Sequence, residues 1–153
     1  MFLIRLTEAL RQEKVAFALV GGFAVSLHGA PRGTLDVDIV LEHTEKNFEA
    51  CEKALVELGL ASKLPVNASE VFKFKDEYIN NRNLIAWSFV NSNNPLELVD
   101  IVLTQDLKNV SIKKIKIQDT QVPLISLKDL ISMKETTGRP QDIEDVKILK
   151  ELK

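Results

Sequence analysis

The sequence has little cysteine, no long apolar run and no strong excess of charge. Cys51 is its only cysteine, which excludes an intramolecular disulfide and a cysteine-based zinc site. No stretch approaches the roughly 20 apolar residues that a membrane-spanning helix requires. The opening stretch MFLIRLTEALRQEK is too short and too charged for an export signal. These absences favour a protein of the reducing cytoplasm that does not act with a membrane.

The formal net charge is −2, so no overall positive field draws the chain toward nucleic acid or an anionic membrane. Two local groups of basic residues are present: Lys108, Lys113, Lys114 and Lys116, and then Lys147, Lys150 and Lys153. We interpret both groups as solvated faces of a strand and a helix, in preference to a nucleic-acid footprint.

The 153 residues, 45% hydrophobic and 27% charged, are those of an ordinary globular protein. A chain of this length is expected to form one compact domain over residues 1–153. It can bury roughly 70% of its unfolded surface, so neither a disulfide nor a structural metal is needed for folding.

Apolar residues that recur at helical spacing or alternate at a spacing of two predict the secondary structure. Helices are expected over residues 3–14, 23–28, 44–58, 126–136 and 140–152. Strands are expected over residues 15–20, 35–41, 72–75, 84–90, 96–103 and 115–117, with a hairpin-like turn at 91–95. This uneven order predicts an α+β fold, one mixed β-sheet flanked by helices.

Two carboxylates stand two residues apart on the expected strand 35–41. Asp36 and Asp38 therefore project from the same face, and carboxylates so close repel each other unless a cation or a proton lies between them. Mg²⁺ commonly combines one or two carboxylates with substrate phosphates. The alternative is an exposed strand face with two solvated aspartates.

A third carboxylate, Asp100, interrupts the run LVDIV, which is apolar on both faces as a central strand would be. Burying it without a partner would cost several kcal/mol, roughly 3–5. A cation held by Asp36 and Asp38 would serve as that partner. An aspartate at a strand edge or bulge, open to water, explains the residue equally well.

Gly21 and Gly22 connect an expected strand to an expected helix, a turn that lets a phosphate approach backbone N–H groups. Thirteen positions separate Gly22 from Leu35, so this turn and the aspartate strand must be neighbours. Arg32 and Thr34 lie on the connecting loop, where an arginine can bind phosphate oxygens or equally pair with an acidic neighbour such as Asp36 or Glu42.

The expected helix 126–136 has an apolar stripe that continues into Lys134. Such a lysine reaches an internal anion, extends outward to solvent, or pairs with Asp142 or Asp145. Arg139 follows in a Gly–Arg–Pro turn. Lys134 and Arg139 are thus candidates to hold a triphosphate, whereas we interpret His28 as structural.

Taken together, these residues resemble the nucleotidyltransferase superfamily, which has the polymerase-beta-like fold. The resemblance is carried by VGGFAVSLHGAPRGTLDVDIVLE, ELVDIV and MKETTGRPQDIEDVKIL, in residues 15–42, 96–103 and 126–152. The last two pieces are similar to small bacterial members related to the AbiEii toxins. Gln141 departs from this pattern, which often has a basic residue after the Gly–Arg–Pro turn.

The resemblance implies a nucleotidyltransferase-like domain that transfers a nucleoside monophosphate from an NTP to a hydroxyl group. It implies that Asp36, Asp38 and Asp100 are catalytic and bind two Mg²⁺ ions, with Mn²⁺ as a substitute, and that Asp100 can accept the proton of the attacking hydroxyl. The nucleotide would be bound by Gly21, Gly22, Arg32, Thr34, Lys134 and Arg139.

Three acceptors are compatible with the resemblance: a tRNA 3′ end, a protein side chain, or a small molecule such as an antibiotic. A toxin–antitoxin or phage-defence role would add a small partner protein. Two other functions compete with this one. The chain can be a nucleotide- or metal-binding regulatory module without turnover, or a small glycosyltransferase, for which it is short.

Overall fold

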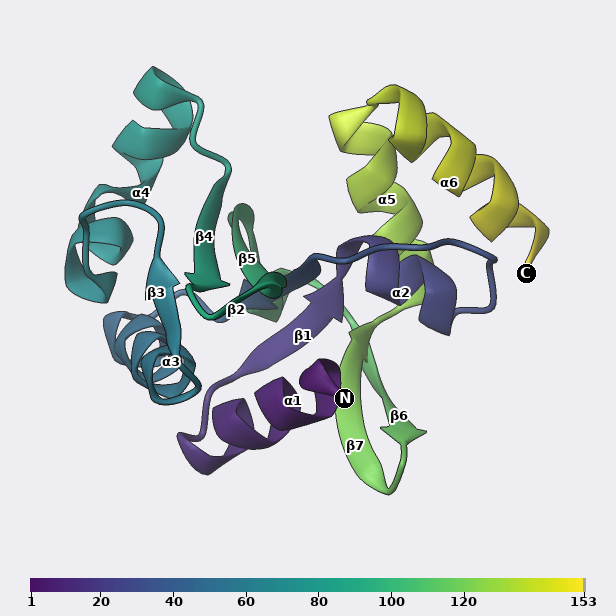
Figure 1. The fold of residues 1–153 in the computed structure, drawn as a ribbon. Helices are drawn as coiled ribbons and strands as arrows, with labels where there is room; N and C mark the ends of the chain where they lie inside the picture. Colours follow the sequence, from purple (N-terminus) through teal and green to yellow (C-terminus); the bar gives the residue numbers. More distant parts are fainter. Residues whose placement is uncertain (153) are drawn as a thin grey trace.

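A computed structural model describes residues 1–152 of the chain. Its elements, in chain order, are α1 (Phe2–Gln12), β1 (Phe17–Val20), α2 (Gly21–Leu27), β2 (Val37–Leu41), α3 (Glu45–Glu57), β3 (Leu60–Ser62), α4 (Ala68–Arg82), β4 (Ala86–Asn91), β5 (Asn94–Asp106), the 3-10 turn η1 (Leu107–Asn109), β6 (Ile112–Ile117), β7 (Thr120–Ile125), α5 (Leu127–Thr137) and α6 (Pro140–Glu151). Figure 1 shows how they are arranged.

The strands form one seven-stranded sheet in the order β3-β4-β5-β2-β1-β7-β6. β2 pairs in parallel with β5, and β1 pairs in parallel with β7, whereas β1 and β2 are antiparallel. The pairs β3–β4, β4–β5 and β6–β7 are also antiparallel. The expected α+β class with a mixed sheet is therefore confirmed.

The two faces of the sheet are covered unequally along β5. Val99 and Ile101 are fully buried, while the alternating residues Leu98, Asp100 and Val102 remain partly exposed. Because successive side chains of a strand point to opposite faces, Asp100 lies on the less covered face. Figure 1 shows α1 and α3 together on one side of the strands, and α2, α5 and α6 grouped at another.

The strand expected at residues 72–75 is wrong, because this segment belongs to helix α4. The Asn67 side chain accepts a hydrogen bond from the backbone of Glu70, and the Glu70 side chain accepts one from the backbone of Asn67. This capping box starts the helix. Only Ala68 and Val71 of α4 are buried, so the alternation of aromatic and basic residues after them lies on a mostly exposed helix surface.

Two short strands, β3 and β7, have no counterpart among the expected elements. The aspartate strand begins at Val37 instead of residue 35, which leaves Asp36 on the preceding loop. The first short helix begins at Gly21 itself instead of residue 23. The hairpin turn between β4 and β5 is confirmed, with Asn91 paired to Asn94 across it.

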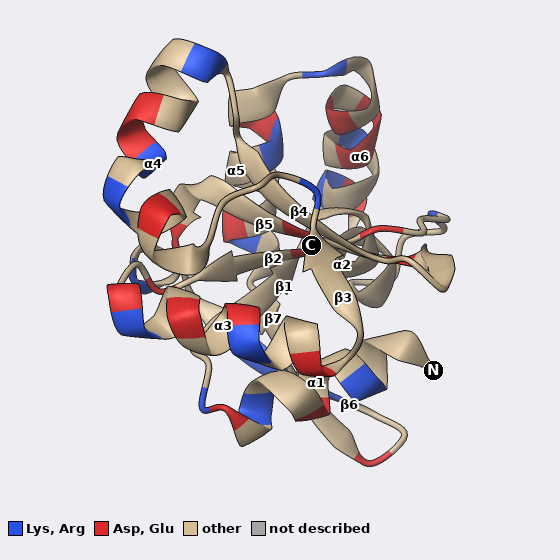
Figure 2. Ribbon diagram, turned by 60° about the vertical axis from the view of Figure 1, so that its left-hand side comes forward, with Lys and Arg blue, Asp and Glu red and all other residues tan. Residues whose placement is uncertain are grey.

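None of the helices within residues 1–152 is both long and apolar enough to cross a membrane. Figure 2 shows acidic and basic residues side by side on α3, α4 and α6. Lys113, Lys114 and Lys116 are exposed on β6, the edge strand of the sheet. Lysines on an edge strand disfavour pairing with another chain, which agrees with their interpretation as solvated residues.

Candidate active site

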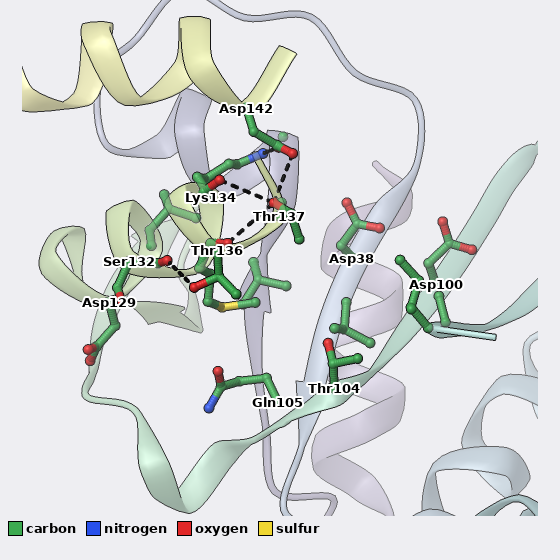
Figure 3. A pocket seen from close by; sticks show the side chains of 18 of the residues that line it. Asp38, Asp100, Thr104, Gln105, Asp129, Ser132, Lys134, Thr136, Thr137 and Asp142 are labelled. Atoms are coloured by element: carbon green, nitrogen blue, oxygen red, sulfur yellow. Dashed lines mark hydrogen bonds and ion pairs between the residues drawn. The ribbon is translucent and has the colours of Figure 1, made fainter. Parts of the chain in front are cut away.

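Asp38 and Asp100 are direct neighbours across two parallel strands. The register of β2 and β5 places Asp38 opposite Asp100, and both side chains project from the same face of the sheet (Figure 3). Residues in register on adjacent strands are about 5 Å apart. Two carboxylates that lie far apart in the sequence are thus brought together by strand pairing.

The turn before α2 packs directly against this pair. Val20, the last residue of β1, pairs with Asp38, and the next residue, Gly21, has a φ of +69°. A Cβ atom at Gly21 would lie 2.0 Å from Oδ2 of Asp38. Two reasons therefore favour glycine at this position: the positive φ, and the lack of space for a Cβ atom beside the carboxyl group.

Gly22 is required for a different contact. A Cβ atom there would lie 2.7 Å from Nη1 of Arg32 and 2.9 Å from Cβ of Thr34. Arg32 and Thr34 belong to the loop that leads into β2. The two glycines thus let this loop and the aspartate strand lie against the first turn of α2. The N–H groups of this turn donate no hydrogen bond to a capping side chain.

The environment of Asp38 opposes its ionised form. Burial is the main cause that raises its pKa from 3.8 to about 7, and the negative charges of Asp100 and Asp36 add to the effect. The charge of Lys134 lowers the pKa but does not compensate. At neutral pH the Asp38 carboxyl group is therefore about half protonated. A bound cation would favour its ionised form.

Asp36 stands apart from the pair. It lies on the loop before β2 and is exposed to solvent, although it lines a cavity that Asp38 and Asp100 also line. Within residues 1–152 no three carboxylate, imidazole or thiol groups are close enough to one another to hold one metal ion. Asp38 and Asp100 thus form a two-carboxylate site, and Asp36 is available at its rim.

Lys134 points inward, as the apolar stripe predicts, and takes part in a buried ion-pair network between α5 and α6. Lys134 Nζ lies 3.0 Å from Oδ2 of Asp145 and 3.4 Å from Oδ1 of Asp142. The lysine is 6% exposed and both aspartates are fully buried. Of the alternatives open for Lys134, pairing with Asp142 and Asp145 is the one observed.

Both arginines of the expected site join this network. Arg32 Nε donates to Oδ1 of Asp145 at 3.0 Å, so its partner is neither Asp36 nor Glu42. Arg139 Nε donates to Oδ2 of Asp142 at 2.8 Å, and its side chain remains 68% exposed. Three cations from the loop, α5 and the α5–α6 turn are therefore held by two carboxylates of α6.

The charge of Asp142 is strongly stabilised. Burial alone would raise its pKa, but hydrogen bonds from Arg139 and Thr137 outweigh this effect and hold the pKa well below its usual range. The Thr137 hydroxyl donates at 2.8 Å (Figure 3). Asp142 is thus ionised throughout the physiological range and anchors Arg139 and Lys134.

A cavity of about 480 Å³ brings these groups together. All the residues expected in the site line it: Gly21, Gly22, Arg32, Thr34, Asp36, Asp38, Asp100, Lys134 and Arg139. Figure 3 shows the two carboxylates on one wall and Lys134 with Asp142 on the opposite wall. The volume lies within the range of roughly 300–1,000 Å³ typical of small-molecule sites.

Several residues of the site have no sequence signal strong enough to reveal them. Thr104 and Gln105 at the end of β5, and Ser132 and Thr136 on α5, line the cavity with hydroxyl and amide groups. Ser88 donates a hydrogen bond to Asp100 from β4. Asp142 and Asp145, three positions apart on one side of a helix, were expected as alternative partners of Lys134, but no pattern in the sequence indicated that Asp145 also holds Arg32. His28 bonds the backbone oxygen of Ile125, a structural role.

The donor set fits a hard divalent cation at Asp38 and Asp100. Both groups are carboxylates, the ligands that Mg²⁺ and Mn²⁺ prefer. Burial first, and then the negative charges of Asp100 and Asp36, raise the pKa of Asp38, and a divalent cation beside the two carboxylates would offset these effects. The charge of Lys134 acts in the same direction as a cation, but its ammonium group is paired with Asp142 and Asp145.

No protein-family model matches the sequence, and neither does any curated protein. Solved structures do resemble the fold. The lincosamide antibiotic adenylyltransferase LnuA, bound to lincomycin, matches with a TM-score of 0.67 and 16% identity over 99% of this chain and 96% of its own. The antibiotic-resistance factor ANT(2'')-Ia matches with a TM-score of 0.64 and 12% identity, over 97% and 80% of the two chains.

An antigenic nucleotidyltransferase-like protein from Paracoccidioides brasiliensis gives a TM-score of 0.62 and 18% identity, covering 98% of this chain and 74% of its own. These likenesses show that the chain has a nucleotidyltransferase-like fold.

Proposed function

We propose that this chain is a nucleotidyltransferase that moves a nucleoside monophosphate from an NTP to a hydroxyl group of an acceptor. The observation that carries the proposal is the in-register pair Asp38 and Asp100, packed against Gly21 in a cavity that also contains cationic groups. Nucleotidyl transfer needs both features, since the reacting phosphate is anionic and charge develops on its oxygens.

Asp38 and Asp100 would hold Mg²⁺ or Mn²⁺, with Asp36 turning in from the rim as a third ligand when nucleotide is present. When bound, such ions stabilise the charge on the attacking and leaving oxygens. The carboxylates orient the reacting centre beneath the first turn of α2. Asp100 accepts the proton that the acceptor hydroxyl loses as it attacks the α-phosphorus.

The phosphate chain would lie toward α5 and α6. Arg139 uses Nε and Nη2 to contact Asp142, and its exposed guanidinium keeps a further donor for a phosphate oxygen. Lys134 uses two of its three donors on Asp142 and Asp145 and can direct the third into the cavity. Arg32, Thr34 and the backbone of Gly21 and Gly22 complete the phosphate side.

The acceptor that we favour for the first tests is a small molecule. LnuA, which this chain matches over nearly its whole length, is an antibiotic adenylyltransferase bound to lincomycin, and ANT(2'')-Ia is known in complex with adenylyl-2''-tobramycin. A protein side chain or a tRNA 3′ end are the other acceptors to be compared. A role beside a small partner protein in a toxin–antitoxin or phage-defence system is part of the same proposal.

The test is a transfer assay with each α-³²P-labelled NTP, Mg²⁺ or Mn²⁺, and panels of the three acceptor classes. Labelled acceptor together with released pyrophosphate is the expected result, and Asp38→Asn should abolish both. Asp119→Asn is a matched control, because Asp119 lies on the exposed β6–β7 turn, where its carboxylate forms a surface ion pair with Lys116. Wild-type and Asp38→Asn proteins of equal activity would refute the assignment.

The alternative is a nucleotide- or metal-binding regulatory module without turnover. It is favoured by one observation, that the three cations of the cavity are already paired with buried carboxylates. Calorimetric titration with Mg²⁺ and NTP separates the two functions. Binding without transfer or pyrophosphate release, across all acceptor classes, would support the module.

A further inference from the structure

A row of side chains crosses four adjacent strands at the site. Val20 on β1 is in register with Asp38 on β2, Asp38 with Asp100 on β5, and Asp100 with Ser88 on β4. Residues in register lie on the same face of a sheet. Ser88 therefore extends the carboxylate pair by one strand, on the side away from Gly21.

Ser88 is in direct contact with Asp100. Its Oγ donates a hydrogen bond to Oδ1 of Asp100 at 2.5 Å, and Ser88 itself is half-buried. Its neighbours on the same face of β4 are Ala86 and Val90, which offer no polar group. The hydroxyl is thus the one side-chain donor that the described part of β4 presents to the carboxylates.

This contact limits the movement of Asp100. The terminal torsion of an aspartate is broad and fixed only weakly by the backbone, whereas the position of Ser88 is set by the strand pairing. A hydrogen bond to Oδ1 restricts the rotation of the carboxyl group about this torsion. Asp100 is then held by Ser88 on one side while Asp38 lies on the other.

We propose that Ser88 is a positioning residue for Asp100, setting the orientation in which Asp100 and Asp38 together bind a divalent cation; this rests on the proposed function. The residue acts through Asp100 and does not touch the reacting atoms. Hydrogen-bond partners of metal ligands typically change metal affinity by about 10–100-fold when removed.

Three single variants test the proposal. Ser88→Ala removes the hydroxyl, and Ser88→Thr keeps it in a residue that suits a strand. Ser62→Ala is the matched control on the neighbouring strand β3, since its hydroxyl accepts from Trp87 Nε1 and contacts neither carboxylate. Mn²⁺ binding is measured by electron paramagnetic resonance, with and without NTP, together with thermal unfolding, intact mass and steady-state kinetics.

We expect Ser88→Ala to weaken Mn²⁺ binding about tenfold and to lower kcat with little change in the KM for NTP. Ser88→Thr should stay within about threefold of wild type by the same measure. Ser62→Ala should lower the unfolding temperature yet leave Mn²⁺ affinity unchanged. A merely structural role for Ser88 would instead give the Ser62→Ala pattern.

Unchanged Mn²⁺ affinity in Ser88→Ala overturns the proposal, as does failure of the wild type to bind Mn²⁺. A nucleotide adduct on Ser88 in the intact mass overturns it too, because Ser88 would then be a nucleophile. Wild-type protein that binds Mn²⁺ but transfers no nucleotide would reject the proposed function alone. In that case the Mn²⁺ titrations of the three variants still decide the role of Ser88.

Discussion

Gly21 and Asp38 are packed so closely that the smallest side chain would not fit between them. A Cβ at Gly21 would lie 2.0 Å from Oδ2, 2.7 Å from Cγ and 2.8 Å from Cβ of Asp38. The contact joins the β1–α2 turn to the carboxylate strand. It also explains why the glycine at this position cannot be exchanged without moving the carboxyl group.

Gly21→Ala should lower the free energy of unfolding by about 2–4 kcal/mol, because a positive φ costs about 1–2 kcal/mol and the clash adds a displacement of Asp38. Gly138→Ala is the matched control, since Gly138 has a φ of +59° but a Cβ atom there would lie 3.7 Å from the backbone oxygen of Glu135, an ordinary contact. It should lose only about 1 kcal/mol. Equal losses in urea unfolding would show that the contact with Asp38 is unimportant.

Asp38→Asn should make the folded state more stable at pH 8 while abolishing transfer. The pKa of Asp38 is raised to about 7 in the folded protein from 3.8, so the native state holds a proton that the unfolded chain releases. The stability that the wild type owes to this bound proton is fully present below about pH 4 and is lost as the pH rises through 7. The asparagine side chain cannot ionise, so the variant does not lose stability in this way. At pH 8 its free energy of unfolding should exceed that of the wild type by roughly 1–3 kcal/mol.

The measurement is urea unfolding of both proteins at pH 5 and pH 8. The stability difference between variant and wild type should grow from the lower to the higher pH. Asp119→Asn, changed at an exposed turn, should show no such trend. A difference that is the same at both pH values would mean that Asp38 is not protonated in the folded state.

Mg²⁺ should stabilise the wild type, and more at pH 8 than at pH 5, because the ionised pair of Asp38 and Asp100 is the form that binds a cation. Thermal unfolding with millimolar Mg²⁺ or Mn²⁺ measures the effect. Ligand at 100 times its Kd adds about 2.7 kcal/mol. Asp38→Asn should lose this stabilisation, and an equal shift in both proteins would place the cation elsewhere.

Asp145→Asn should destabilise the protein by about 3 kcal/mol, because it leaves Arg32 and Lys134 without one of their buried counter-charges. Glu135→Gln, which breaks the exposed pair with Lys150, is the matched control and should cost less than about 1 kcal/mol. Chemical unfolding compares the two. Similar small effects would indicate that the α5–α6 network is solvated and replaceable.

Local sequence patterns predicted much of this site. Period-two alternation marked the strand that carries Asp38, although Asp36 lies on the loop before it and not on the same strand. The apolar run around Asp100 marked a central strand. The stripe ending in Lys134 marked an inward lysine, which is 6% exposed. These signals are readable because burial imposes a fixed spacing on each kind of element.

Other features depended on contacts that no local pattern encodes. Residues 72–75 alternate like a strand, yet they belong to helix α4, which starts at the capping box of Asn67. Because most of this helix is exposed to solvent, its sequence does not need the apolar stripe by which a buried helix is recognised. Arg32 had several acidic partners in reach of its loop. It pairs with Asp145, a choice made by how α6 packs against α5.

The residue types and their spacing were enough to indicate the fold class and the chemical character of the site, carboxylates facing a glycine turn. Only the folded chain decided the register that sets Asp38 beside Asp100 and Ser88, and the ion pairs that hold Lys134, Arg32 and Arg139. The reason is physical. Periodicity follows from the geometry of a single element, whereas register and ion pairing follow from the mutual packing of elements far apart in the chain.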